Sequence, residues 1–509
     1  MKIKLLNEIM YFFFISVFFF STSLFLFQDY LNSHWTASFD QETVLAYNAL
    51  LFNSGIEQEM TDHSAYFTIL FTSFFYKILN FVGLNDFYKF SQITDLNLNQ
   101  IFEQNIYYLR LLSILMHTFA FLATTYFFLN YFKDKIFSFF LSIIVFFLYG
   151  NLSLIYGVRP ELISYIFLIS SLIFIFRFLE KNNIIDLFLF FLLIFCSILN
   201  KLQVIFYFPF ILLFSYFNLK TIYSTNIFNR LDVKKEKILS YIFIFLFLYI
   251  SLKSFVFLRD YKTWIFLLLL ISITNLFFYK VSSKKNISDN LIILNLCLIF
   301  SYIFFNLIVF LHPSASLISI NTTIFSVIKS ASQYNSVTSS LSLSMLDFLI
   351  NLFLLFIKNF FLIFQIIFKT FNSYSVILLI LMIFFFINYR KFSNKEKFLI
   401  LSLLISYFSV FGLNLLRGNF LNYYIYNDYI LVFLAGIVFY KLKRNFAYLI
   451  CIGIIFVNIY INFDKKFIEM KDNSLVLCRE LNDNPNNYFE TWHKQMPVEK
   501  FNDYCLNYN

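Results

Sequence analysis

Length, composition and charge exclude a water-soluble enzyme. The chain has 509 residues, of which 60% are apolar and only 13% are charged, and 79 of them are Phe. Soluble domains are nearer half apolar and a quarter charged, so the excess apolar surface must face lipid. The net charge of +10 would suit nucleic acid, but the basic residues form short clusters between apolar runs, where positive charge determines membrane orientation. We therefore expect no nucleic-acid partner.

Apolar runs recur along the chain, and a run of about 20 residues is enough to cross a bilayer. We predict an all-α polytopic membrane protein with about thirteen transmembrane helices. The first run has no small-residue cleavage site, so we interpret it as a retained span rather than as a signal peptide. The predicted spans are 7–27, 106–130, 135–150, 161–179, 184–199, 202–219, 238–258, 263–279, 290–311, 374–388, 398–416, 428–441 and 446–462.

The charges of the connecting loops predict an orientation. With the N-terminus inside, the cytoplasmic loops carry basic clusters and the short outer loops carry only isolated basic residues, as the positive-inside rule requires. This assignment holds only if two further apolar segments, 66–84 and 346–371, lie along the outer face without crossing. Lys77 lies in the first of these segments, and Lys358 and Lys369 lie in the second, which favours that placement.

The predicted domain organisation follows from this orientation. Residues 1–462 form one polytopic domain, and 463–509 form a polar extracytoplasmic tail. Two outer regions are long: 28–105, which is rich in acidic residues, and 312–373, which begins with a Ser-, Thr- and Asn-rich stretch and ends with an interfacial helix.

An acidic pair follows the first predicted span. Asp40 and Glu42 open an amphipathic segment of the first outer region. Two carboxylates at such a short separation repel one another, which favours proton uptake by one of them. Such a pair suits a general base or a divalent-cation site. Acidic pairs in aqueous loops are more often simply solvated, so this pair alone does not establish a site.

The first outer region resembles that of the GT-C superfamily of membrane glycosyltransferases, in particular the dolichyl-phosphate-mannose–protein mannosyltransferase and aminoarabinose-transferase branch. Residues 40–42 (Asp-Gln-Glu) match the family's acidic pair with one residue inserted, and 62–65 (Asp-His-Ser-Ala) match its second element without the prolines. The resemblance implies a GT-C-like fold whose first outer loop carries interfacial helices. It also implies catalytic and substrate-binding roles for Asp40 or Glu42, and for Asp62, His63 and Tyr66.

A second candidate site is the stretch 156–161 at the outer end of the fourth predicted span. Pro160 and Glu161 suit the first turn of a helix, which is the plain structural interpretation. The functional interpretation is that Arg159 faces the same outer vestibule as Asp40 and binds a lipid phosphate, which a guanidinium matches well. Members of the resembled family often carry a charged residue here, so Arg159 and Glu161 are candidate substrate-binding residues.

A third candidate is the outer loop 417–428 before the penultimate span. Its Asn and Tyr residues, with one Arg and one Asp, suit sugar hydroxyls and a phosphate. An interfacial aromatic belt is the alternative interpretation. The resemblance implies that Arg417, Tyr423 and Tyr424 contact the lipid phosphate or the sugar.

These features predict an inverting glycosyltransferase that moves a sugar from a polyprenyl-phosphate donor to a hydroxyl of a glycan, lipid or protein. It would act on the outer face of a membrane, and we favour the bacterial inner membrane over the endoplasmic reticulum. The chain has no Walker-type phosphate loop or dinucleotide fingerprint, so no nucleotide cofactor is expected, although the acidic cluster could hold a divalent cation.

Two alternatives stay open. An envelope polysaccharide polymerase or ligase would use 312–345 as its long outer loop. A lipid-linked oligosaccharide flippase or transporter would place ionisable residues near the bilayer centre, at a cost of about 2.5–3.5 kcal/mol each. The predicted spans are nearly free of charge at their centres, and Arg110 and Arg177 lie toward span ends, where they can snorkel.

Overall fold

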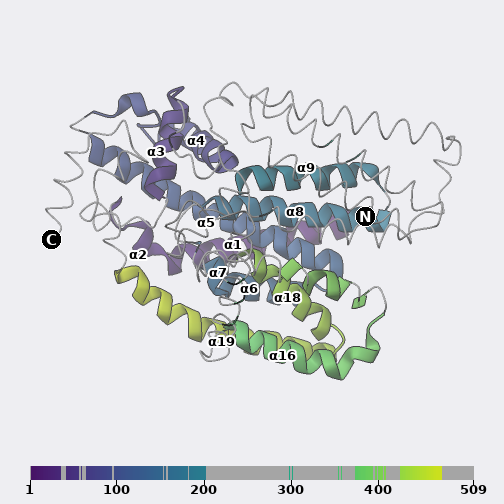
Figure 1. The fold of residues 1–509 in the computed structure, drawn as a ribbon. Coiled ribbons are helices and arrows are strands. Elements are labelled where there is room, and N and C mark those ends of the chain that lie inside the picture. The colour runs from purple at the N-terminus through teal and green to yellow at the C-terminus, as the bar shows by residue number, and fades with distance from the viewer. Residues whose placement is uncertain are drawn as a thin grey trace, which may run out of the picture.

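The computed structural model places long helices side by side, with shorter helices gathered at one end (Figure 1). It describes residues 2–35, 42–56, 59, 65–94, 97–152, 154–155, 159–181, 183–201, 204, 297, 301, 354, 357, 361, 373–393, 396–397, 399–404, 406–407 and 425–472.

All regular structure in these residues is helical. Four stretches are long and apolar enough to cross a membrane: Leu6–Leu26, Leu98–Phe132, Pro160–Phe178 and Arg444–Ile461. The described residues therefore confirm an all-α protein with apolar helices of membrane-spanning length. The total of about thirteen stays a prediction, because several predicted spans lie wholly or partly outside the described residues: 202–219, 238–258, 263–279, 290–311 and 398–416.

Most predicted spans coincide with an observed helix. The largest differences are at α5, which begins at Leu98 rather than at 106, and at α19, which continues to Asp472 rather than ending at 462. The elements are α1 (Lys2–Leu26), α2 (Gln28–Leu31), α3 (Glu42–Asn53), α4 (Tyr66–Phe81), η2 (Phe90–Gln92), α5 (Leu98–Phe132), α6 (Lys135–Phe147), α7 (Tyr149–Leu152), α8 (Pro160–Lys181), α9 (Ile184–Asn200), α16 (Ser373–Asn388), η6 (Tyr389–Lys391), α18 (Ile425–Phe439) and α19 (Arg444–Asp472).

Local sequence explains the sharp turns between long helices. α5 ends at Lys133, which has left-handed backbone angles (φ 56°), and Asp134 then caps α6 by accepting a hydrogen bond from the backbone N–H of Phe137. Asn183 caps α9 in the same way, through the N–H of Ile185. These short connections force each pair of helices to run antiparallel.

The bundle has two chemically different ends. We call the end with α2, α3 and α4 the loop end. We call the opposite end, where α5, α8 and α16 end and where α6, α9 and α19 begin, the basic end. α8 and α9 lie side by side, and the start of α8 lies next to the end of α9. Ser164 and Ser197 each donate to the other's backbone carbonyl, at 2.9 and 2.6 Å. α1 begins at the basic end, where the Tyr11 hydroxyl donates to the carbonyl of Lys135.

α5 is the longest helix and joins the first loop to the bundle. Its 35 residues correspond to about 52 Å, well beyond the roughly 30 Å of a bilayer's hydrocarbon core. The first loop packs on the extra length, since the Tyr76 hydroxyl donates to the Asn105 carbonyl at 2.9 Å. Asn85 donates to the Asn105 side chain at 3.1 Å. α4 coincides with the segment 66–84 that we predicted to lie on the outer face.

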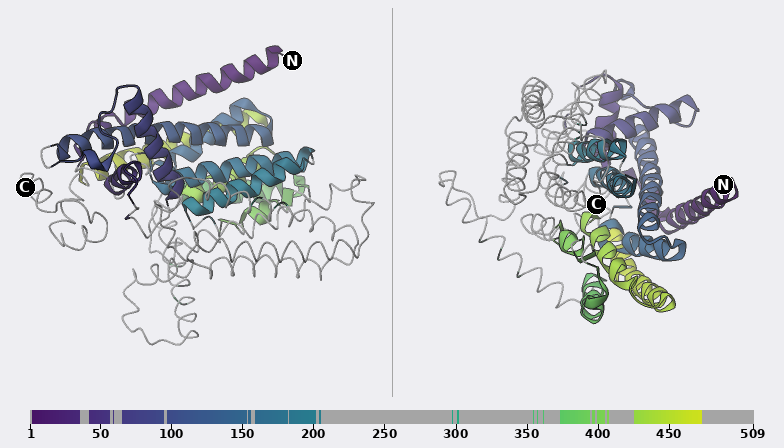
Figure 2. Two further views of the ribbon diagram at one scale, coloured as in Figure 1. Left: turned by 90° about the horizontal axis from the view of Figure 1, so that it is seen from above. Right: turned by 90° about the vertical axis from the view of Figure 1, so that its right-hand side faces the viewer.

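Helices differ in how much apolar surface they bury. α1 diverges from the other helices toward its N-terminus (Figure 2) and exposes large apolar side chains such as Phe14, which is 61% exposed. α18 is buried along its whole length. Gly436 allows this close packing, because a Cβ there would lie 2.8 Å from Leu141 and 2.9 Å from Phe132. The exposed face of α1 suits lipid, and α18 suits the centre of a bundle.

Candidate active site

Buried charged and polar side chains from several helices meet at the loop end. They come from α3, α5, α7, α16, α18, the start of α8 and the end of α9, and each is almost fully buried. Burying a charge away from water is costly unless it is paired, so such a concentration in an apolar bundle marks a candidate functional site. We call the following residues the loop-end cluster: Glu42, Arg110, Asn151, Arg159, Glu161, Lys201, Tyr374 and Asp428.

Glu42 and Arg110 form the first part of this cluster. Glu42 is the first residue of α3, and its carboxylate accepts from Nε of Arg110 at 3.3 Å. The guanidinium also donates to the backbone carbonyls of Tyr30 (3.1 Å) and Ser33 (2.5 Å) and lies 4.5 Å from the centre of the Tyr30 ring. Arg110 therefore ties the chain that follows the first span to α5. The side chain of Glu42 is 1% exposed, which excludes the solvated alternative for this residue.

Asp428 organises the second part, in the first turn of α18. One carboxylate oxygen accepts from the Tyr374 hydroxyl at 2.8 Å, and the other accepts from the backbone and side-chain N–H groups of Asn151 at 3.0 and 2.9 Å. The Tyr374 hydroxyl in turn accepts from the N–H of Gly150 at 3.1 Å. This network fixes α7, α16 and α18 to one another.

Glu161 and Lys201 form the third part, with Arg159 beside them. The Lys201 ammonium lies 2.6 Å from the Glu161 carboxylate, and Arg159 Nε lies 3.9 Å from it. The adjacent Asn200 donates to the Pro160 carbonyl at 2.7 Å and accepts from the N–H of Thr68 at 3.0 Å. The first turns of α4 and α8 and the last turn of α9 are therefore held together.

Residues 426–428 connect the second and third parts. The Tyr426 hydroxyl donates to the Glu161 carbonyl at 3.4 Å, and Asp428 belongs to the second part. Between them, Asn427 is fully buried, and neither its amide nitrogen nor its amide oxygen has a hydrogen-bond partner among the described residues. A buried amide without partners requires an explanation, and a polar ligand or a water molecule would satisfy it.

Glu59 and Ala65 are the described residues nearest in sequence to Asp62 and His63. Glu59 accepts from the buried Tyr47 hydroxyl at 3.0 Å and donates its N–H to Asn48 at 2.9 Å. Ala65 has left-handed backbone angles (φ 41°), which are strained for a residue other than glycine. Glu59 therefore lies against α3, and Ala65 lies directly before α4.

The structure describes four of the predicted site residues, and of these it places Arg159 beside Glu161, whereas Glu42 pairs with Arg110. Glu42, Tyr66, Arg159 and Glu161 all lie at the loop end, and burial raises the pKa of Tyr66 to about 12. Glu161 lies in the first turn of α8, as the helix-dipole interpretation required, and it also pairs with Lys201. The remaining predictions lie outside the described residues: Asp40, Asp62, His63, Arg417, Tyr423 and Tyr424.

Sequence reasoning missed five members of the cluster, of which Asn151 and Tyr374 are uncharged and Arg110, Lys201 and Asp428 are charged. We expected Arg110 to snorkel, whereas it is 2% exposed and paired with Glu42. Neither Lys201 nor Asp428 is among the predicted site residues, although Asp428 is the last residue of the third candidate loop. The available signal was a charge inside or at the edge of an apolar run, because such a charge requires a partner.

Among the described residues, no group of three or more His, Cys, Asp or Glu side chains is arranged to hold a metal ion. A divalent cation bound by the first loop therefore stays a prediction that rests on the sequence.

Comparison with known proteins adds no assignment. No family model matches the chain, and no curated protein matches it either.

Proposed function

We propose that this protein is an inverting glycosyltransferase that uses a polyprenyl-phosphate sugar as its donor. It would act on the outer face of the bacterial inner membrane. The observation that carries the proposal is the concentration of buried charged groups at the loop end. A lipid-linked sugar resides at the bilayer interface, so a site there requires no soluble nucleotide-binding domain. The basic end would face the cytoplasm, as the positive-inside rule favours.

The contacts of Glu42 support Asp40 as the general base. A carboxylate paired with a buried guanidinium is stabilised in its charged form and is therefore a weak proton acceptor. Glu42 would act as an anchor that positions the start of α3. The proton would then go to Asp40, two residues earlier in the sequence.

The proposed reaction is a single displacement. The acceptor oxygen forms a bond to the anomeric carbon from the side opposite the phosphate, and its proton passes to the Asp40 carboxylate. The bond between the anomeric carbon and the phosphate oxygen breaks, and its electron pair stays on the polyprenyl phosphate. Arg159 would stabilise the negative charge on the departing phosphate, and electrostatic stabilisation of this kind is commonly the largest catalytic contribution.

Asp40→Asn is the first test, with purified full-length protein and labelled polyprenyl-phosphate sugars. General-base catalysis contributes about 10²–10⁴-fold, so we expect the transfer rate to fall by about that factor while the folded fraction is unchanged. Asp86→Asn is the matched control, because Asp86 is an exposed acidic residue of the same loop. Undiminished transfer by Asp40→Asn would remove Asp40 from the mechanism.

A flippase for lipid-linked oligosaccharides is the second candidate, favoured by the buried charges of Glu161, Lys201 and Asp428 within apolar helices. These charges lie in the first or last turn of their helices or directly beyond it, rather than midway along them, which suits chemistry at an interface better than passage through the bilayer. Movement of an intact lipid-linked oligosaccharide across vesicles, with no new glycosidic bond, would establish this alternative.

A further inference from the structure

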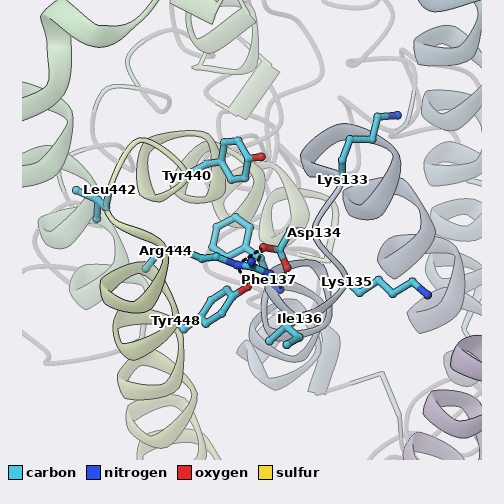
Figure 3. A pocket seen from close by; sticks show the side chains of 10 residues that line it. Lys133, Asp134, Lys135, Ile136, Phe137, Tyr440, Leu442, Arg444 and Tyr448 are labelled. Carbon is cyan, nitrogen blue, oxygen red and sulfur yellow. Dashed lines mark hydrogen bonds and ion pairs between the residues drawn. The ribbon is translucent and has the colours of Figure 1, made fainter.

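A cavity of about 780 Å³ opens at the basic end between the start of α6 and the start of α19. It is lined by Lys133, Asp134, Lys135, Phe137, Arg444 and Tyr448, among others. Figure 3 shows Arg444 and Tyr448 reaching from α19 toward Asp134, while the side chains of Lys133 and Lys135, on the other side of the cavity, point away from Asp134. The cavity belongs to the opposite end of the bundle from the loop-end cluster, so the proposed transferase reaction does not use it.

We infer that this cavity binds the phosphate-bearing headgroup of an anionic phospholipid in the leaflet that surrounds the basic end. The cations among its lining residues are Lys133, Lys135 and Arg444. The acidic groups nearby are Asp134, which lines the cavity, and Glu180, which pairs with Lys133 at 3.3 Å. These three cations and two carboxylates leave a net charge of +1, which matches a headgroup with one negative charge. Basic pockets between helices on the cytoplasmic side are typical sites for such headgroups.

Arg444 is the residue best placed to hold the phosphate. Its Nε lies 2.6 Å from the Tyr448 hydroxyl and 3.0 Å from Asp134, and the hydroxyl donates to the same carboxylate at 2.7 Å. These contacts orient the guanidinium, and among the described residues no hydrogen bond involves its two terminal nitrogens. A guanidinium held through Nε presents its other edge for bidentate contact with a phosphate.

The surroundings favour a lipid over a soluble phosphate. α6 and α19 pack against each other, and the spanning part of α19 is only 22% buried. Leu449 and Phe456 on α19 are 65% and 68% exposed, and Ile136 at the cavity edge is 51% exposed. Acyl chains of a lipid whose headgroup occupies the cavity would cover this apolar surface.

Native mass spectrometry of the purified full-length chain tests the inference, with dioleoyl-phosphatidylglycerol and dioleoyl-phosphatidylcholine as probes. We expect preferential binding of phosphatidylglycerol, weakened about five-fold by each of Arg444→Gln and Lys135→Gln. The control is Lys391→Gln, which removes an exposed charge at the same end but outside the cavity, and it should leave binding unchanged. Should Arg444→Gln fail to fold, Lys135→Gln decides, since its ammonium makes a ring contact with Tyr11 rather than an ion pair among the described residues.

Three outcomes would overturn the inference. Equal binding of the two lipids would show that the headgroup charge is not recognised. An equal loss in Lys391→Gln would attribute the preference to diffuse surface charge. Displacement of phosphatidylglycerol by inorganic phosphate at matched concentration would identify a site for soluble anions.

Discussion

Glu42 and Arg110 show how a charge in an apolar run is accommodated in this protein. The two side chains are 1% and 2% exposed, so neither is stabilised by bulk water. Arg110 instead binds three backbone carbonyls and the Tyr30 ring in addition to the carboxylate. A buried ion pair of this kind adds little net stability, but removing one partner leaves the other charge buried and unpaired.

We therefore expect Arg110→Ala to destabilise the protein by about 3–5 kcal/mol. The double variant Arg110→Met/Glu42→Gln should recover much of the loss, because it removes both charges. Lys133→Met, which breaks the exposed pair with Glu180, should change stability little and serves as the control. Unfolding in a titration of denaturing detergent measures all three. A double variant no more stable than Arg110→Ala would contradict this account.

At the scale of elements, the docking of α18 depends on a few polar contacts in its first turn. Asp428 receives three hydrogen bonds, one from Tyr374 on α16 and two from Asn151 on α7. The rest of α18 is mostly apolar, and the close approach of Gly436 to Leu141 and Phe132 is its other position-specific contact. The polar network and this contact therefore fix the position of α18 along the bundle.

Tyr374→Phe removes one donor from the buried carboxylate and also removes the hydroxyl that accepts from the Gly150 N–H. Each buried group that loses its partner costs about 1–3 kcal/mol, so we expect a loss of at least that size. Tyr389→Phe, at an exposed tyrosine just beyond the other end of α16, should be neutral. Thermal unfolding in detergent compares the two, and equal stabilities would show that the network does not hold α18.

The loop after α16 gives a pH-dependent prediction. Burial alone would raise the pKa of Glu396, but hydrogen bonds from Lys441 (2.6 Å) and Ser393 outweigh it and lower the pKa below 4.5. A carboxyl group with a lowered pKa stabilises the fold above its unfolded pKa and loses that contribution as the pH falls through the folded value.

We expect wild type to exceed Glu396→Gln in melting temperature at pH 7 and to lose this advantage below about pH 4.5. Melting curves recorded from pH 7 to pH 3 measure the difference. A constant difference across that range would show that Glu396 does not contribute through its charge.

Helix positions were largely predictable, because apolar runs of fixed length determine them. α8 and α9 lie within two residues of the predicted limits 161–179 and 184–199. The additional turns of α5 before 106 were not predictable from hydropathy, because Asn105 binds the first loop, donating to the Phe87 carbonyl and accepting from Asn85. The hydrogen bonds between cluster residues could not be predicted from the sequence either. Asp428 and Asn151 are far apart in the sequence, and only the packing of the helices brings them together.

At the scale of the whole molecule, the charge distribution predicts which end faces the cytoplasm. Cysteine introduced at Asp86 should react with a membrane-impermeant maleimide in intact cells, and cysteine at Lys391 only after permeabilisation. Both side chains are exposed at opposite ends of the bundle, and Cys478 and Cys505 would first be replaced by Ser. The reverse labelling pattern would place the loop end in the cytosol and rule out the transferase proposal.

The length and continuity of α5 have a mechanical consequence. α5 is one continuous helix that packs against α8, α3 and α4, with Asn105 contacting Tyr76 of α4 and Thr124 contacting Tyr165 of α8. A helix without a kink tilts as one piece, so a change in bilayer thickness that tilts α5 would also displace the first loop. The acyl-chain length of the surrounding lipid would then influence how well Glu42, Arg159 and Asp428 are aligned, although all three side chains are buried inside the protein.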